Sequence, residues 1–195
     1  MDTSKSVTLF ASYQPDQHLE ALERFLDAGS PPVYAGFGSM PKKDQTDNVP
    51  IIVEAARSVG RRVVISKFWE EPSEFRRSDD VFFISKYPHL KLFPRMAVVI
   101  HHGGAGTVAT SAISGVPQIV VPHLLDQYYW GSQIYRSKLG PKPIWRSRLT
   151  SRKLAGAIRE ALSDKRMKQK ATAVSRMIDR QNSLDMAVRE LLRGV

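Results

Sequence analysis

The chain has 195 residues, a length typical of one domain with a short tail. Its 42% hydrophobic and 25% charged residues are usual for a globular protein and exclude the disordered and low-complexity classes. The net charge of +10 predicts attraction to phosphates, nucleic acids or anionic membrane surfaces, without choosing among them. Because the chain has no cysteine, disulfides, cysteine-ligated zinc and thiol nucleophiles are excluded.

The first residues carry no targeting signal that we recognise. Residues 1–15 have no clear periodicity and are interpreted as a linker or an orphaned edge element. A helix is predicted from Asp16, its N-cap, to the Gly and Pro residues at 29–32. No apolar run approaches the roughly 20 residues that span a bilayer, so we expect a soluble, cytoplasmic protein.

Short apolar runs rich in β-branched residues alternate with helical patterns along the middle of the chain. The runs are 33–35, 63–65, 81–84, 98–100 and 119–121, and Ile52 to Val59 is one of the helical patterns between them. This alternation predicts an α/β fold with a doubly wound parallel sheet. From about residue 150 three helical stripes follow, at 154–162, 167–178 and 184–192, so 16–195 is expected to be one domain with a C-terminal helical extension.

Glycine and polar residues follow the predicted strands, at the edge of the sheet where ligands bind. The segment from His101 to Thr107 contains three glycines before a predicted helix, which is typical of a phosphate site at a helix N-terminus. The alternative is a tight turn that only lets the helix pack closely. Gly36 to Ser39 is a second, weaker loop of this kind, and the absence of a Gly-Lys-Ser/Thr sequence near either loop excludes a P-loop.

Two other interpretations compete at the same loop. Gly104, Gly106 and Ala109 satisfy the dinucleotide fingerprint, with Asp126 near the expected offset, so an oxidoreductase domain stays an alternative. Histidines and Asp126 could also be imagined as metal ligands, but adjacent histidines at a strand end point to opposite faces, so we expect no metal site. His102 is expected to contact phosphate, and His101 to pack under the loop.

Asp126 and Gln127 follow the last predicted strand and precede three aromatic residues. Carboxylate and amide groups suit sugar hydroxyls, and aromatic rings cover the apolar face of a sugar. Equally, the pair could mark a helix N-terminus, with the aromatic residues in the core. The basic residues of the helical tail are usual for a solvated face, and peripheral contact with a membrane surface is the alternative.

Five segments in order resemble the C-terminal, donor-binding half of GT-B-fold glycosyltransferases, in the branch of sterol and bacterial natural-product glucosyltransferases related to UDP-glucuronosyltransferases. These segments are 32–40, 88–95, 101–107, 115–118 and 126–127. The resemblance covers about residues 32 to 178 and implies a Rossmann-like half of a GT-B fold.

The resemblance also implies roles for individual residues. It assigns the donor diphosphate to Ser39, His102, Gly104, Ala105, Gly106 and Thr107. It assigns the donor sugar to Asp126 and Gln127, and the base and ribose to Pro88, His89 and Thr110. The catalytic base is expected in an N-terminal acceptor-binding domain, in cis or in trans, so this chain alone is expected to be catalytically incomplete.

We therefore expect a domain that binds a nucleotide-sugar, UDP-hexose in our interpretation, for an inverting glycosyltransferase acting on a hydroxyl acceptor such as a sterol, lipid or secondary metabolite. No cofactor is expected besides this donor substrate. The alternatives are a non-catalytic donor-binding subunit of a split enzyme, the dinucleotide-binding oxidoreductase domain, and nonspecific RNA binding through the net charge.

Overall fold

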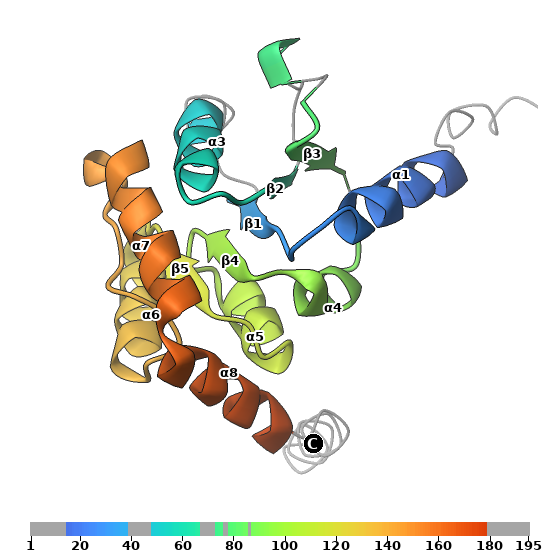
Figure 1. Cartoon of the computed structure of the whole chain (residues 1–195). Helices are drawn as coiled ribbons and strands as arrows, with labels where there is room; N and C mark the ends of the chain where they lie inside the picture. Colours follow the sequence, from blue (N-terminus) through green and yellow to red (C-terminus); the bar gives the residue numbers. More distant parts are fainter. Residues whose placement is uncertain (1–14, 39–47, 67–72, 76–77, 86, 179–195) are drawn as a thin grey trace, which may run out of the picture.

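A computed structural model of the chain describes residues 15–38, 48–66, 73–75, 78–85 and 87–178. Its centre is a five-stranded parallel sheet with the strand order β3-β2-β1-β4-β5 (Figure 1). The strands are β1 Val33–Gly36, β2 Val63–Ser66, β3 Val81–Ile84, β4 Val98–His101 and β5 Gln118–Val120. All five predicted strands are confirmed, each to within a residue at either end.

The strand order places a topological switch point beside the central strand β1. The chain builds outward from β1 to β2 and β3, then returns to add β4 on the other side of β1. Gly36 of β1 and His101 of β4 are paired at the carboxyl ends of the two strands. Ligands of open parallel sheets bind in the crevice at such a point, because the loops leave the strands in opposite directions there.

Helices connect the strands and cover both faces of the sheet. They are α1 Pro15–Asp27, α3 Asn48–Ser58, α4 His89–Leu92, α5 Ala105–Ile113, α6 Leu125–Arg136, α7 Ser151–Ser163 and α8 Lys165–Met177, with 3-10 turns at Ser73–Phe75, Phe93–Arg95 and Arg146–Arg148. The first helix begins at Pro15, so the prediction of Asp16 as its N-cap was wrong; proline suits the first helical turn because its φ is fixed there. The predicted stripe at 184–192 lies outside the described residues.

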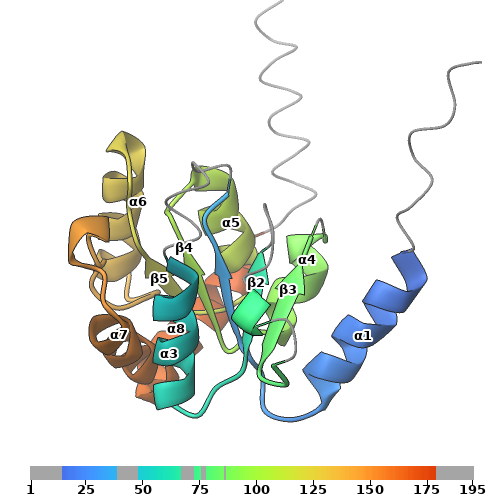
Figure 2. The same cartoon turned by 90° about the horizontal axis from the view of Figure 1, so that it is seen from above.

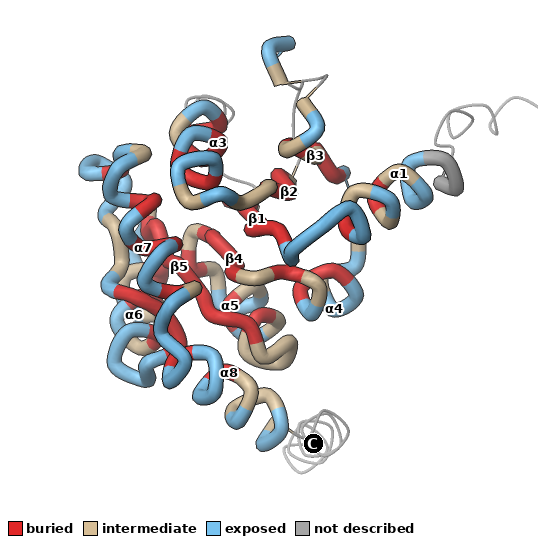
Figure 3. Tube along the Cα trace, in the orientation of Figure 1, coloured by how far each residue is buried: buried red, intermediate tan, exposed pale blue. Residues whose placement is uncertain are grey.

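The core lies in two layers, one on each face of the sheet. α3 and α7 cover one face, and α1, α4 and α5 cover the other, with α6 and α8 flanking α5 (Figure 2). The strands are buried along almost their whole length, as Figure 3 shows, which explains why they are nearly continuous apolar runs in the sequence. The outer side of β5 is covered by residues 139–144, since Gln118 N–H donates to Leu139 O and Ile144 N–H to Val120 O.

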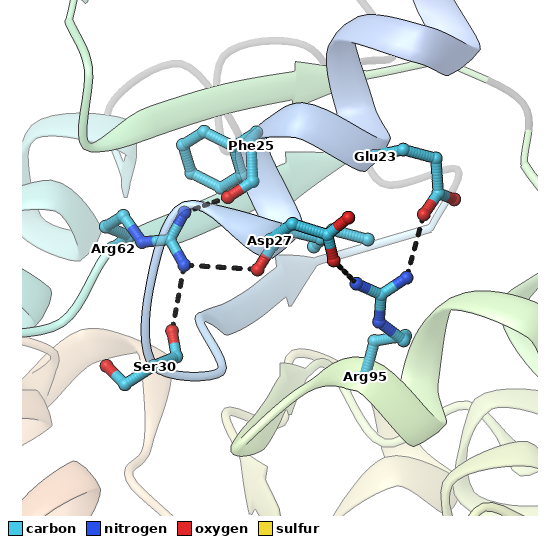
Figure 4. Close-up of polar contacts among 7 residues, drawn as sticks. Glu23, Phe25, Asp27, Ser30, Arg62 and Arg95 are labelled. Carbon is cyan, nitrogen blue, oxygen red and sulfur yellow. Dashed lines mark hydrogen bonds and ion pairs between the residues drawn. The ribbon is translucent and has the colours of Figure 1, made fainter.

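Two arginines hold the C-terminal end of α1 (Figure 4). Arg62 donates to the backbone carbonyls of Phe25, Leu26 and Ser30, and its guanidinium lies 4.7 Å from the centre of the Phe25 ring. Arg95 binds the carboxylates of Glu23 and Asp27 at 2.8 and 2.5 Å. A cation at the last carbonyls of a helix complements the negative end of its dipole, so these contacts dock α1 on the sheet.

Candidate functional site

His101, the last residue of β4, lies under the glycine loop and is fully buried. Its Nδ1 accepts the N–H of Gly103 at 3.0 Å, which leaves the ring proton on Nε2 to be donated to Oε1 of Gln118 at 3.0 Å. Burial lowers the pKa of His101 to about 3, so the ring is neutral. The prediction that His101 packs beneath the loop is confirmed.

His102 points the other way, into the space between two loops. An ideal Cβ built on Gly38 would lie 2.8 Å from Cε1 of His102, and one built on Gly104 would lie 2.5 Å from its Nε2. The imidazole therefore fills the gap between the loop after β1 and the loop after β4, at the switch point of the sheet. A side chain at either position would therefore displace the ring.

The electrostatic surroundings of His102 favour a neutral ring that can still take up a proton. Burial lowers its pKa, while the Asp126 carboxylate and the backbone of Gly36 act in the opposite direction. Nδ1 is buried, and no described residue forms a hydrogen bond to it. An anion bound beside this ring would favour its protonated form.

The glycine loop is also fixed against α6. Gly103 has a φ of +97°, which side-chain-bearing residues rarely adopt. A Cβ at Gly103 would meet Cγ1 of Val120 at 2.9 Å and the carbonyl oxygen of Gln127 at 3.0 Å. The loop after β4 and the first turn of α6 thus lie in direct contact, which brings the predicted diphosphate and sugar residues together.

The N-terminus of α5 opens onto the same space. Gly104 is its N-cap and offers no side-chain acceptor, so the first amides of the helix have no partner within it. Ala105 and Gly106 are exposed, and Thr107 is half-buried in the same turn. Thr110, predicted to contact the ribose, donates its hydroxyl to the carbonyl of Gly106 at 2.8 Å.

Gln127 and Asp126 sit in the first turn of α6 but differ in their surroundings. The Oε1 atom of Gln127 accepts the backbone N–H groups of His123 at 2.7 Å and Leu124 at 3.0 Å, so the buried side chain caps its own helix. Asp126 is exposed and close enough to His102 to raise the pKa of that ring. Asp126 is therefore available to a ligand, whereas Gln127 can offer only its amide nitrogen.

His89 begins α4 and is part of the scaffold at the carboxyl end of β1. Its ring stacks on Phe93 with centroids 4.6 Å apart, and its Nε2 lies 3.0 Å from the hydroxyl of Tyr34. Burial lowers the pKa of His89 and raises that of Tyr34 to about 12. The neighbouring Pro88, predicted with it to hold the base, is exposed.

The structure thus gathers His102, the N-terminus of α5 and Asp126 at one edge of the sheet. Ser39 lies outside the described residues. Gln118 was missed by the sequence analysis: its Nε2 donates to the carbonyl of Val108 at 3.3 Å, which links His101 to α5, and no local motif predicts this contact. Within the described ranges, no three His, Asp or Glu side chains are grouped to hold a metal ion, and none of the helices has the length and apolarity to cross a membrane.

The sequence matches a described family and known proteins over most of its length. Residues 51–185 match the family described as the C-terminal domain of erythromycin biosynthesis protein CIII-like proteins. The chain is 35% identical over 185 residues to a sterol 3-beta-glucosyltransferase of Arabidopsis thaliana, covering 93% of this chain and 29% of the relative. It is 38% identical over 179 residues to the vancomycin aglycone glucosyltransferase of Amycolatopsis orientalis, covering 89% of this chain and 42% of the relative.

Solved structures of glycosyltransferases share the fold. A UDP-glucose:anthocyanidin 3-O-glucosyltransferase in complex with UDP superimposes with a TM-score of 0.68 at 20% identity, over 87% of this chain and 40% of the other. The glycosyltransferase of kitacinnamycin superimposes with a TM-score of 0.66 at 22% identity, over 76% of this chain and 39% of the other. The chain spans less than half the length of these proteins. It belongs to the family of erythromycin biosynthesis protein CIII-like C-terminal domains, and its relatives are glycosyltransferases.

Proposed function

We propose that this chain is the domain of an inverting glycosyltransferase that binds the nucleotide-sugar donor, with UDP-hexose as the expected donor. The observation that carries the proposal is the imidazole of His102 held between Gly38 and Gly104 at the switch point. The first amides of α5 open beside it, so an imidazole that an anion would help to protonate and a helix N-terminus converge on one space, as suits a diphosphate.

In this proposal the domain stabilises the leaving group. As the acceptor hydroxyl attacks the anomeric carbon, negative charge accumulates on the departing diphosphate. His102, Thr107 and the amides of Ala105 and Gly106 would donate to that charge, and Ser39 would add a further hydroxyl. Donors already fixed in position lower the barrier because they need no reorganisation during the reaction.

The sugar and the base of the donor are assigned to the flanking residues. Asp126 would accept hydrogen bonds from sugar hydroxyls, and the amide nitrogen of Gln127 would donate to one. Pro88, His89 and Thr110 would line the base and ribose through their backbone and apolar surfaces, because the His89 ring and the Thr110 hydroxyl already bond within the domain.

We also propose that the acceptor and the catalytic base belong to an N-terminal domain, in cis or in trans. The relatives are more than twice as long as the part of them that this chain matches. The relatives' names include sterol and vancomycin aglycone glucosyltransferases, which supports an apolar hydroxyl acceptor of the sterol, lipid or secondary-metabolite type. Peripheral contact with a membrane stays a prediction.

Thermal unfolding with nucleotides tests the donor assignment. UDP at 100 times its dissociation constant should add about 2.7 kcal/mol of stability, which for a domain of this size raises Tm by roughly 5 to 10 °C. NAD serves as the comparison, because it is the ligand of the competing oxidoreductase interpretation. If NAD raises Tm while UDP, TDP and GDP leave it unchanged, the proposal is wrong.

A further inference from the structure

One stretch of the chain carries most of its excess positive charge. Residues 127–159 contain eight Lys and Arg residues and no Asp or Glu, in a protein with a net charge of +10. This stretch forms α6, the segment that covers the edge of β5, and most of α7. The charge is therefore concentrated on one side of the domain.

The centre of this region is hollowed by two adjoining cavities, of about 330 and 310 Å³. Both cavities are lined by Lys142, Pro143 and Trp145, so they adjoin along residues 141–145 and together form one depression. We define the Trp145 surface as six of the residues that line it, the four cations and two aromatic residues: Tyr128, Arg136, Lys142, Trp145, Arg148 and Lys153.

The four cations of the Trp145 surface are exposed and uncompensated. Among the residues that the structure describes, none of the four forms an ion pair. Only Glu160, which lines one of the two cavities, supplies a negative charge to the lining. Four like charges around a depression attract anions and repel a second copy of this basic chain.

The Trp145 surface and the adjoining first turn of α6 also expose apolar groups. The rings of Tyr128 and Trp145 lie 4.7 Å apart at 31°, and Trp145 is 51% exposed. Leu125 precedes Tyr128 by three residues, so it continues the same stripe of α6, and it is 89% exposed. Aromatic and aliphatic groups standing among cations match the interface of a lipid bilayer, where rings and aliphatic chains lie below the headgroups and cations contact the phosphates.

We propose that the Trp145 surface binds an anionic lipid bilayer, with the cations on the lipid phosphates and with Trp145 and Leu125 in the headgroup region. RNA would also neutralise the charge and could stack on Trp145, but it offers no apolar partner for the exposed Leu125. Because Leu125 adjoins Asp126, the membrane would lie beside the donor site. The proposal concerns a different surface and does not depend on the donor assignment.

Sedimentation with vesicles tests the proposal, using phosphatidylcholine alone and phosphatidylcholine with 30% phosphatidylglycerol. We expect binding only to the anionic vesicles, weakened by salt. Each cation near an anionic surface contributes about fivefold to partitioning, so Arg136→Gln, Lys142→Gln, Arg148→Gln and Lys153→Gln together should lower it at least a hundredfold. An unchanged circular dichroism spectrum and Tm for this variant would show that the fold is intact.

The matched control removes four exposed cations from α8, through K165Q, R166Q, K168Q and K170Q. It has the same net charge as the first variant and should keep most of the vesicle binding. Equal losses in the two variants would mean that net charge alone drives binding and would overturn the assignment of the surface.

A second measurement follows Trp145 directly, without removing charge. Lipids brominated near the headgroup should quench the tryptophan fluorescence of the wild type, and Trp145→Phe should lose most of that quenching. Undiminished quenching in this variant would overturn the proposal. Binding of a poly(U) RNA with no binding to anionic vesicles would also overturn it, and would assign the surface to nucleic acid.

Discussion

The imidazole of His102 occupies the place in which a side chain on Gly104 would begin, with 2.5 Å between an ideal Cβ at Gly104 and Nε2 of His102. Gly104 has a φ of −63°, so its backbone would accept any residue, and the glycine is needed for space rather than for conformation. Gly106, two residues further, has nothing within 4 Å of an ideal Cβ. We therefore expect opposite effects on ligand binding when each of these two glycines is replaced by alanine.

Gly104→Ala should displace His102 and reduce UDP affinity about as much as His102→Ala. Loss of one donor to a charged oxygen costs about 1.5 to 3 kcal/mol, or about 10- to 150-fold in the dissociation constant measured by calorimetry. Gly106→Ala is the matched control and should retain binding, with stability unchanged or raised by up to about 1 kcal/mol. Equal losses for both alanine variants would mean that the loop backbone, and not the imidazole, sets the affinity.

The sequence predicted the sheet well because each strand is buried on both faces and each run is therefore apolar throughout. It also predicted the opposite orientations of His101 and His102, since alternation along a strand is a local rule. It did not predict the partners of Gln118 or the cap formed by Gln127, because both depend on which polar atoms meet after folding. The start of α1 was missed by one residue, since Pro15 and Asp16 both suit a first turn.

Asp126→Ala should distinguish a nucleotide-sugar from a bare nucleotide. If the exposed carboxylate meets sugar hydroxyls, the substitution lowers the affinity for UDP-glucose about tenfold or more and barely changes that for UDP. Calorimetry with both ligands measures the two effects on one protein sample. Parallel losses for UDP and UDP-glucose would place Asp126 on the nucleotide or in the scaffold.

Gln127 requires a different pair of substitutions, because it caps α6. Gln127→Ala should cost about 1 kcal/mol of unfolding free energy, since the amides of His123 and Leu124 lose their acceptor. Gln127→Glu keeps an acceptor oxygen there and should retain that stability, while losing the amide donor that a sugar hydroxyl would meet. Reduced UDP-glucose affinity in a stable Gln127→Glu variant would support the sugar contact, and unchanged affinity would leave Gln127 as a cap alone.

The isolated chain is expected to transfer no sugar. A general base must lie within about 3.2 Å of the acceptor hydroxyl, directly or through one water. None of three histidines is placed to act as this base. His101 is fully buried, His89 is hydrogen-bonded to Tyr34, and His102 lies at the proposed diphosphate site. Incubation with UDP-glucose and sterol or phenolic acceptors should yield no glycoside until an N-terminal half of a relative is added. Turnover by the chain alone would reveal a base that we have not identified.

Arg62→Ala should loosen α1 and lower the unfolding free energy by about 1 to 3 kcal/mol, because its contacts with the carbonyls of Phe25 and Leu26 are partly buried. Arg24→Ala is the control on the same helix. Arg24 pairs with Glu20 at 3.7 Å, and both side chains are more than two-thirds exposed, so its loss should cost about 0.5 kcal/mol or less. Urea unfolding compares the two variants, and equal effects would show that Arg62 does not anchor the helix.

His101 should make the stability of the domain depend on pH. Its pKa in the folded protein is about 3, below its ordinary value near 6.5. Between these two pH values the imidazole is protonated in the unfolded chain and neutral in the folded chain. The stabilisation is complete above pH 6.5 and is lost as the pH falls from there towards 3, by up to about 1.4 kcal/mol per pH unit.

His101→Asn keeps an acceptor near the position of Nδ1 for the N–H of Gly103, but it does not titrate. Urea unfolding at pH 7, 6 and 5 should therefore show a shallower decline for the variant than for the wild type. His89 and His102, whose pKa values burial also lowers, remain in both proteins, so the difference between the two profiles isolates His101. Parallel profiles would mean that His101 takes up a proton in the folded state, and that the neutral tautomer we assign beneath the glycine loop is wrong.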